Sequence, residues 1–175
     1  MNEPIPTAVR LQVSIGPALS LPINVAVTQD GTAPLPSDPG VAGKITLAGT
    51  DSDGDGVRDD VQRFISTNFA SSAKIQSALT QLAKAYLAKI YDAGNGELSS
   101  IDATNSLYAI DCLFVTSPST AGALLVQLEG QIFNTTDRLL AYLAARSSPN
   151  TSFYLLPSRQ ESQTRCMVNP NGLPN

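Results

Sequence analysis

The sequence predicts a mainly α-helical protein, in which an antiparallel bundle of about four helices follows a short N-terminal region containing β-strands and an acidic loop. Two observations predict this fold class. Residues 40–117 and 119–148 contain no proline, which leaves room for long helices. From Val57 onward, apolar residues recur at the spacing of one helix face. The 175 residues fit one domain with a core of its own.

The N-terminal region, residues 1–50, is expected to be extended. In residues 10–15 and 23–27 every second side chain is apolar, which is typical of strands with one buried face. Residues 31–43 are rich in Thr, Ala, Pro, Ser and Gly and are predicted to be a linker. Residues 45–49 are predicted to be a third short extended piece that leads into the acidic loop.

Four amphipathic helices are predicted for the body of the chain. Each has apolar residues three and four positions apart on one face, and connections of a few residues indicate antiparallel neighbours. The predicted helices span about 57–69, 72–91, 99–115 and 119–146. Ser119 is the candidate N-cap of the last helix, and the polar stretch 134–137 is a candidate kink within it.

Three regions are therefore expected within one domain. They are the extended region 1–50, the acidic loop with the bundle at 51–148, and a C-terminal tail at 149–175 that packs on the bundle. The tail contains an apolar run at 153–156, which is predicted to lie on the bundle as a strap. A groove between the helices that binds a protein or peptide is the alternative use of exposed apolar residues.

The two cysteines, Cys112 and Cys166, are predicted to form a disulfide bond. Cys166 lies in a polar tail with little else to anchor it. A bond between them closes a loop of about 55 residues, which is worth roughly 4 kcal/mol in the chain-entropy model. Two unrelated buried thiols are the alternative, because free cysteine is among the most buried residue types.

A disulfide presupposes an oxidising compartment, so we expect an extracytoplasmic protein: periplasmic, secreted, or a lipoprotein at the cell surface. We also expect that a signal segment has been removed, because Met1 followed by NEPIPT is typical of a start codon added to a mature chain. A bacterial envelope protein of this kind is expected to meet other proteins there.

The composition disfavours several functions. The chain has no histidine, and so no side chain whose ordinary pKa lies near neutrality, which disfavours zinc, haem and serine-triad chemistry. The net charge is −4 and no cluster of Lys and Arg is present, which argues against a nucleic-acid partner. The longest apolar runs, such as ALLVQL at 123–128, are too short to cross a bilayer.

The acidic loop, residues 51–60 with the sequence DSDGDGVRDD, holds five of the 15 carboxylates of the chain. Calcium takes six to eight oxygen ligands, and a chain curling around the ion supplies them from alternate residues, with glycine at the sharpest turn. The spacing here places Asp51 first in such a loop and Gly56 at the sixth position. The candidate ligands of Ca²⁺ are Asp51, Asp53, Asp55, the Val57 carbonyl, Asp59, Asp60 and Gln62.

This stretch resembles the DxDxDG calcium loops of the EF-hand superfamily, and more closely those of thrombospondin type 3 repeats and dockerin-like modules. The resemblance covers about 12 residues and implies a calcium ligand rather than a family for the whole chain. It departs from the pattern at position 12, where the EF-hand has a bidentate Glu and this chain has Gln62. A weaker amide contact from Gln62, or a contact from Asp60 in its place, implies micromolar to millimolar affinity.

Two alternatives bear on this region. The aspartates could instead be an acidic cap of the helix that follows, since carboxylates favour the positive end of a helix dipole. Five carboxylates this close repel one another, however, and capping needs only one of them. A second stretch at 92–102, DAGNGELSSID, partly repeats the calcium-loop pattern but has Ala93 where an oxygen ligand belongs, so we expect a helix-to-helix turn there.

The sequence therefore predicts a calcium-binding, non-enzymatic, exported bacterial domain with a structural or protein-binding role. In it calcium fixes the junction between the N-terminal region and the helices. The alternative is a small hydrolase or lyase that uses the acidic loop as a metal-dependent active site. The two differ in whether protein atoms fill all the coordination positions of the ion.

Overall fold

A computed structural model describes residues 34–95, 100–147 and 157–175 of the chain. Several predicted features lie outside these residues. They are the strands at 10–15 and 23–27, the apolar run 153–156, and residues 96–99 of the stretch 92–102.

All the helices described below belong to one compact unit, Leu35–Asn175. Residues 35–50, which the sequence groups with the N-terminal region, lie in the same unit as the helices.

The expectation of a mainly helical protein is confirmed. The described residues form α1 (Asp59–Asn68), α2 (Ala73–Asn95), α3 (Ser100–Thr116), α4 (Ala121–Ile132), α5 (Thr136–Ser147) and α6 (Arg159–Thr164), with short 3₁₀ turns η1 (Ala42–Lys44) and η2 (Pro170–Gly172). They contain no strand, and residues 45–48 of the predicted extended piece are bends. None of the described helices combines the length and the apolar character that a membrane span requires.

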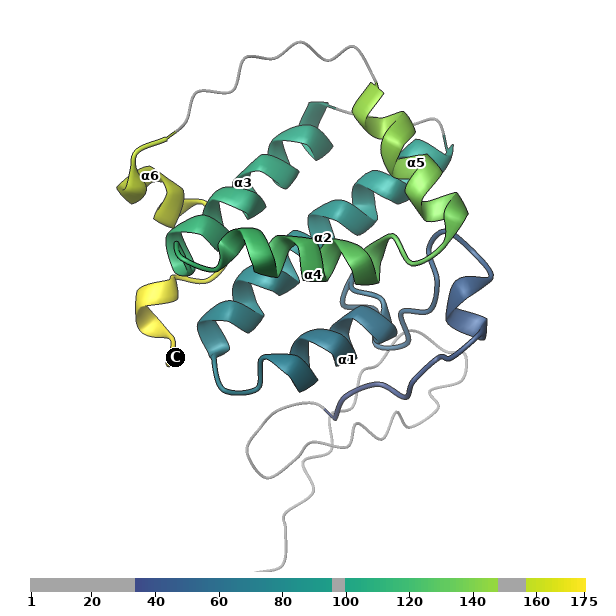
Figure 1. The fold of residues 1–175 in the computed structure, drawn as a ribbon, viewed down its shortest axis with the longest axis horizontal. Coiled ribbons are helices and arrows are strands. Elements are labelled where there is room, and N and C mark those ends of the chain that lie inside the picture. Colours follow the sequence, from purple (N-terminus) through teal and green to yellow (C-terminus); the bar gives the residue numbers. More distant parts are fainter. Residues whose placement is uncertain (1–33, 96–99, 148–156) are drawn as a thin grey trace, which may run out of the picture. The chain divides into compact units, whose positions relative to one another are not determined.

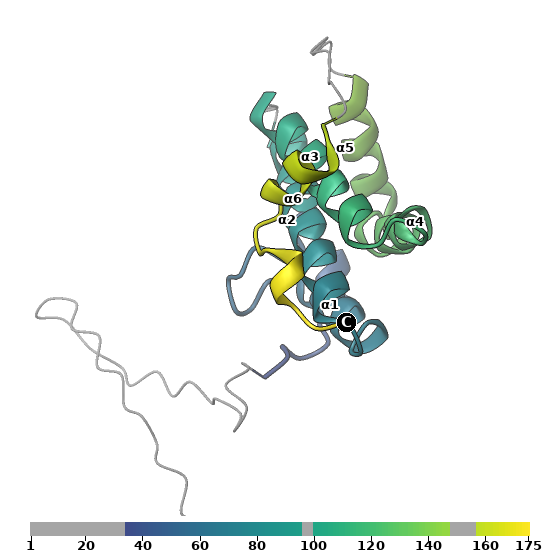
Figure 2. The same cartoon turned by 90° about the vertical axis from the view of Figure 1, so that its left-hand side faces the viewer.

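The helices pack in two directions. Figure 1 shows α2 and α3 side by side, with α4 lying across both of them. Figure 2 shows α4 nearly end on, while α2 and α3 run up and down the picture. The helices are thus not all aligned, as they would be in an up-and-down bundle. α5 packs on α2, while α1 contacts α2 and α4.

The predicted fourth helix at 119–146 is in fact two helices, α4 and α5, and this part of the prediction is wrong. The break follows from two side chains. Arg58 donates hydrogen bonds to the carbonyls of Gln131 and Ile132, which end α4. Thr135 Oγ1 then accepts the backbone N–H of Arg138 and caps the start of α5. Ser119 is not the N-cap of α4, since Thr120 occupies that position and makes no side-chain cap bond.

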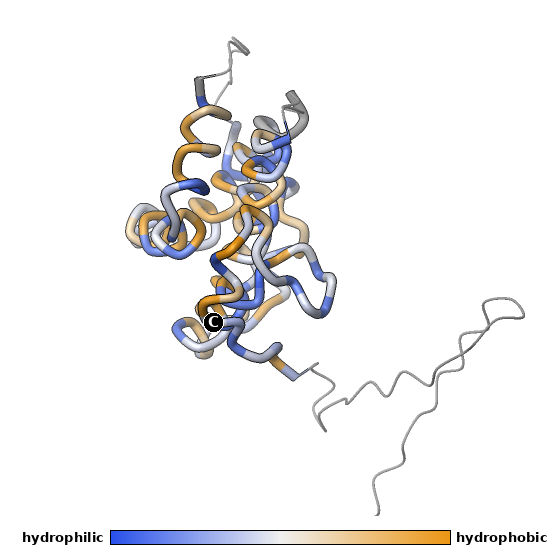
Figure 3. Tube along the Cα trace, turned by 90° about the vertical axis from the view of Figure 1, so that its right-hand side faces the viewer, coloured by the Kyte–Doolittle hydropathy of each residue, from blue (hydrophilic) through white to orange (hydrophobic). Residues whose placement is uncertain are grey.

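The core lies where α1, α2, α3 and α4 meet. Its fully enclosed residues include Val61, Leu79, Leu82, Leu113 and Leu128, one or more from each of these helices. Hydrophobic and hydrophilic turns alternate along the helices in Figure 3, as expected of amphipathic helices around one core. Ser72 Oγ caps α2 by accepting the N–H of Ile75, so the long central helix begins where the sequence predicts.

The C-terminal residues are held on α2 and α3. The predicted disulfide is confirmed: Cys112 of α3 is bonded to Cys166, just beyond α6. Gln81 of α2 supports it by donating to the carbonyl of Arg165 and accepting the N–H of Met167, both at 2.8 Å. Arg165 also forms an ion pair with Asp111 at 2.6 Å.

Candidate metal centre

The acidic loop is wound around one carboxylate, that of Asp51. Its Oδ1 accepts the backbone N–H groups of Gly54 and Asp55 at 2.9 and 3.2 Å, and its Oδ2 accepts that of Gly56 at 2.9 Å. Gly54 and Gly56 have φ of 70° and 85°, in the left-handed region that glycine adopts without steric cost. The sixth loop position is therefore the sharp turn that the spacing predicts.

The ninth loop position closes the loop at its base. The backbone N–H of Asp59 donates to the Thr50 carbonyl at 2.8 Å, and Asp59 Oδ1 accepts the N–H of Ser52 at 2.9 Å. The Asp59 side chain is only 2% exposed. Oxygen atoms of Asp51, Asp53 and Asp59 lie within 4.8 Å of one another, so this group could hold a metal ion. Loop positions 1, 3 and 9 are thus brought together.

The twelfth position, Gln62, faces this group from α1. Its Nε2 donates to Asp53 Oδ2 at 3.0 Å, and this hydrogen bond lowers the pKa of Asp53 from its ordinary value. The other atom of the amide, Oε1, is buried and has no hydrogen-bond partner among the described residues. A buried carbonyl oxygen without a donor is rare and costs free energy. Gln62 therefore contacts one of the three carboxylates, Asp53, and has an amide oxygen without a hydrogen-bond partner among the described residues.

Asp60, the alternative ligand in the sequence, points elsewhere. Its two oxygens accept the Nε and Nη2 donors of Arg58, both at 2.9 Å, and Oδ2 also accepts Nδ2 of Asn134 at 3.0 Å. Burial alone would raise the pKa of Asp60. The hydrogen bonds and charge of Arg58 and the amide of Asn134 outweigh burial and lower this pKa. Asp60 thus forms an ion pair with Arg58 and is not part of the group of three carboxylates.

The two remaining predicted ligands lie on the loop itself. Asp55 Oδ1 accepts the backbone N–H of Val57 at 2.7 Å, so this carboxylate is turned toward its own chain. The Val57 side chain is buried in the core and fixes the loop at its seventh position. The residue at the N-cap of α1 is Arg58, whose side chain makes no cap bond. Asp59 and Asp60 occupy the first turn of α1, where the helix dipole stabilises negative charge.

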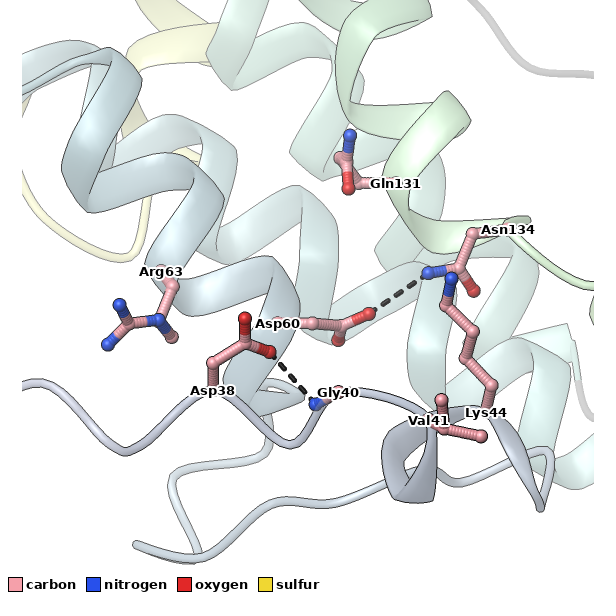
Figure 4. Close-up of a pocket in the computed structure, with 8 residues that line it drawn as sticks. All are labelled: Asp38, Gly40, Val41, Lys44, Asp60, Arg63, Gln131 and Asn134. Atoms are coloured by element: carbon pink, nitrogen blue, oxygen red, sulfur yellow. Dashed lines mark hydrogen bonds between the residues drawn. The ribbon is translucent and has the colours of Figure 1, made fainter.

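A surface pocket of about 450 Å³ lies beside the loop. Figure 4 shows Asp60 at its centre, with the hydrogen bond to Asn134. The residues that line the pocket are Asp38, Gly40, Val41, Lys44, Asp60, Arg63, Gln131 and Asn134. Asp51, Asp53 and Asp59 are not among them, so the pocket and the candidate metal group do not share a carboxylate.

Sequence reasoning missed the residues that hold the loop in place. Arg58 counts in the sequence only as one positive charge among five negative ones, and Arg138 lies in the middle of a predicted helix. Both are buried, and Arg138 donates to three backbone carbonyls in the segment before the loop. No spacing rule connects residues 91 to 95 positions apart, so no signal in the sequence could have placed them there.

Comparisons of the chain with protein-family models, with curated proteins and with solved structures find no match.

Proposed function

We propose that this protein is a calcium-binding, non-enzymatic domain in which the ion locks the acidic loop onto the helices. The proposed ligands are the carboxylates of Asp51, Asp53, Asp55 and Asp59, the Val57 carbonyl and Gln62 Oε1. Asp60 is left out because Arg58 and Asn134 already occupy its oxygens.

The observation that carries this proposal is the unpartnered Oε1 of Gln62. It sits at the loop position where an EF-hand supplies its last ligand. The amide can turn by half a rotation, which exchanges its Nε2 and Oε1 atoms. The carbonyl oxygen would then face the side where Nε2 now meets Asp53. An ion between Gln62 and Asp53 would then be coordinated by an oxygen of each side chain.

Electrostatics also favours a bound cation. Two unit charges about 4 Å apart repel by roughly 1 kcal/mol in water and about 4 kcal/mol at an effective dielectric constant of 20. Asp51, Asp53 and Asp59 approach this separation, and among the described residues none of them forms an ion pair. The nearest arginine in the sequence, Arg58, is committed to Asp60. A divalent ion would offset the repulsion that these three carboxylates exert.

A structural role fits this arrangement better than catalysis. The pocket beside the loop has none of the three clustered carboxylates in its lining. A catalytic metal needs an open coordination position that faces a substrate cavity. A loop that wraps its own carboxylates with backbone N–H groups leaves less room for substrate. The hydrolase or lyase alternative would require substrate to reach the ion from the exposed side of Asp51 and Asp53.

The disulfide supports a location outside the cytoplasm, because such bonds persist in oxidising compartments. Calcium outside the cytoplasm is abundant enough to fill a weak site. With free calcium at 100 times Kd, binding adds about 2.7 kcal/mol to the free energy of unfolding. We therefore propose an extracytoplasmic protein whose loop is calcium-loaded in its working environment.

The test is the thermal unfolding midpoint of EDTA-treated protein, measured with and without about 1 mM calcium or magnesium. We expect calcium to raise the midpoint by several degrees and magnesium to raise it much less, because magnesium demands a tighter octahedral shell. Asp53→Ala should abolish the calcium shift. Asp38→Ala, which removes an exposed aspartate outside the loop, should retain it. A midpoint that calcium leaves unchanged in the wild type would remove the proposal.

A further inference from the structure

A buried arginine on α5 organises the segment that leads into the acidic loop. Arg138 is fully buried. Its Nη2 donates to the carbonyls of Gly43 and Thr46 at 2.6 and 2.8 Å, and its Nε donates to that of Leu47 at 3.1 Å. Within the described part of the chain it forms no ion pair, so backbone carbonyls take up most of its donors. Burial and the neighbouring charge of Arg58 lower the pKa of Arg138. A cation is placed here at a cost in desolvation.

The segment that Arg138 binds, residues 43–47, leads directly to the candidate metal centre. Gly49 has φ of 69°, and a Cβ added there would come within 2.6 Å of Arg58 Cδ and 2.7 Å of Arg138 Nη2. The two arginine side chains therefore close on the backbone of Gly49. One residue later, the carbonyl of Thr50 accepts the N–H of Asp59 at the base of the loop. Arg138 thus binds the segment that ends where the base of the loop closes.

A second line of contacts joins the same arginine to the far end of the loop. Asn134 Oδ1 accepts Arg138 Nη1 at 2.6 Å, and Asn134 Nδ2 donates to Asp60 Oδ2 at 3.0 Å. Asp60 in turn holds Arg58, the residue between Val57 and Asp59. Figure 4 shows the step between Asp60 and Asn134 at the edge of the pocket. Both ends of the loop are therefore tied to Arg138.

We propose that Arg138 is a positioning residue for calcium binding: it holds both ends of the acidic loop so that Asp51 and Asp59 are close before the ion arrives. This inference rests on the proposed function. A loop that is ordered in advance loses less conformational entropy on binding, and so binds its ion more tightly. Residues that orient metal ligands without touching the metal change affinity by about 10- to 100-fold when replaced.

The test is the calcium Kd of EDTA-treated full-length variants, measured by titration calorimetry at a temperature where far-UV circular dichroism shows each variant folded. Arg138→Met removes the guanidinium and should raise Kd at least tenfold. Asn134→Ala is a milder change at the rim of the pocket and should raise Kd several-fold while keeping the fold. Arg165→Met is the matched control, because it removes an arginine ion-paired with Asp111 on α3, away from the loop.

The outcomes separate the two proposals. If the wild type binds calcium and both Arg138→Met and Asn134→Ala keep its Kd, the positioning role is wrong and the calcium site stands. If Arg165→Met raises Kd as much as they do, the effect is general destabilisation and the positioning role is again wrong. If the wild type shows no saturable binding, both proposals fail. Should Arg138→Met not fold, Asn134→Ala decides the matter.

Discussion

At the scale of single residues, Gly49 combines a left-handed backbone with close contacts. Its φ of 69° lies in the left-handed region, and the space where a Cβ would stand is occupied by Arg58, Arg138 and the carbonyl of Gly43. Gly40 also has a positive φ, of 53°, but a Cβ there would meet nothing within 4 Å. The two glycines therefore differ in crowding while sharing the same backbone requirement.

Alanine at these two glycines should separate the two effects. Gly40→Ala is expected to lower the free energy of unfolding by about 1 kcal/mol, which is the cost of the left-handed conformation. Gly49→Ala adds the displacement of two arginines and is expected to cost about 3 kcal/mol. Urea denaturation of both variants in EDTA measures the difference. Equal losses would mean that the side chains of Arg58 and Arg138 move aside at little cost, which would contradict their close packing against Gly49.

At the residue scale, the spacing predicts the sharp turn of the loop, and the assignment of calcium ligands stays a prediction. Three alternating aspartates and the glycine at the sixth position fold into a turn around Asp51, as the pattern implies. The spacing could not decide between Asp60 and Gln62 as the last ligand. That choice depends on Arg58 and on Asn134, which lies 74 residues from Asp60 in the sequence.

At the scale of elements, periodicity located the helices well and their ends less well. α1, α2 and α3 agree with the predicted 57–69, 72–91 and 99–115 to within a few residues, because each buries one apolar stripe against the core. The sequence indicated a kink at 134–137 but not the complete break between α4 and α5. The apolar stripe continues across the break, and the arginine that ends α4 comes from the acidic loop.

The start of α5 provides a prediction about this break. Thr135→Ala removes the hydroxyl that accepts the Arg138 N–H and is expected to lower the free energy of unfolding by about 1 kcal/mol. Thr120→Ala, at the N-cap of α4 where no side-chain cap bond exists, is expected to cost only a few tenths of that. Chemical denaturation of the two variants compares them. A larger loss at Thr120 would show that the cap at Thr135 contributes little.

At the scale of the whole molecule, one covalent bond and a set of hydrogen bonds return the C-terminal tail to the core. The disulfide joins positions 54 residues apart in the sequence, and Gln81 binds the backbone on both sides of Cys166. The sequence predicted the disulfide because the tail had little else to anchor it. It did not predict Gln81, since a buried amide in an amphipathic helix gives no sign of its partner.

Removing the disulfide should destabilise the protein without undoing its fold. The double variant Cys112→Ser and Cys166→Ser is expected to lose 2 to 4 kcal/mol, mainly because the unfolded chain gains freedom. Calorimetry gives the change in unfolding midpoint, and circular dichroism should show unchanged helix content. A loss of helix content in the variant would mean that the hydrogen bonds of Gln81 do not suffice to hold the tail.

The central claim is that the loop 51–62 binds calcium with oxygen atoms of the protein. The most direct test is a crystal structure of the protein crystallised in about 5 mM calcium. We expect one ion at about 2.3 to 2.6 Å from the carboxylates of Asp51, Asp53, Asp55 and Asp59, the Val57 carbonyl and Gln62 Oε1. A loop without an ion at that concentration, or with Gln62 still donating its Nε2 to Asp53, would contradict the claim.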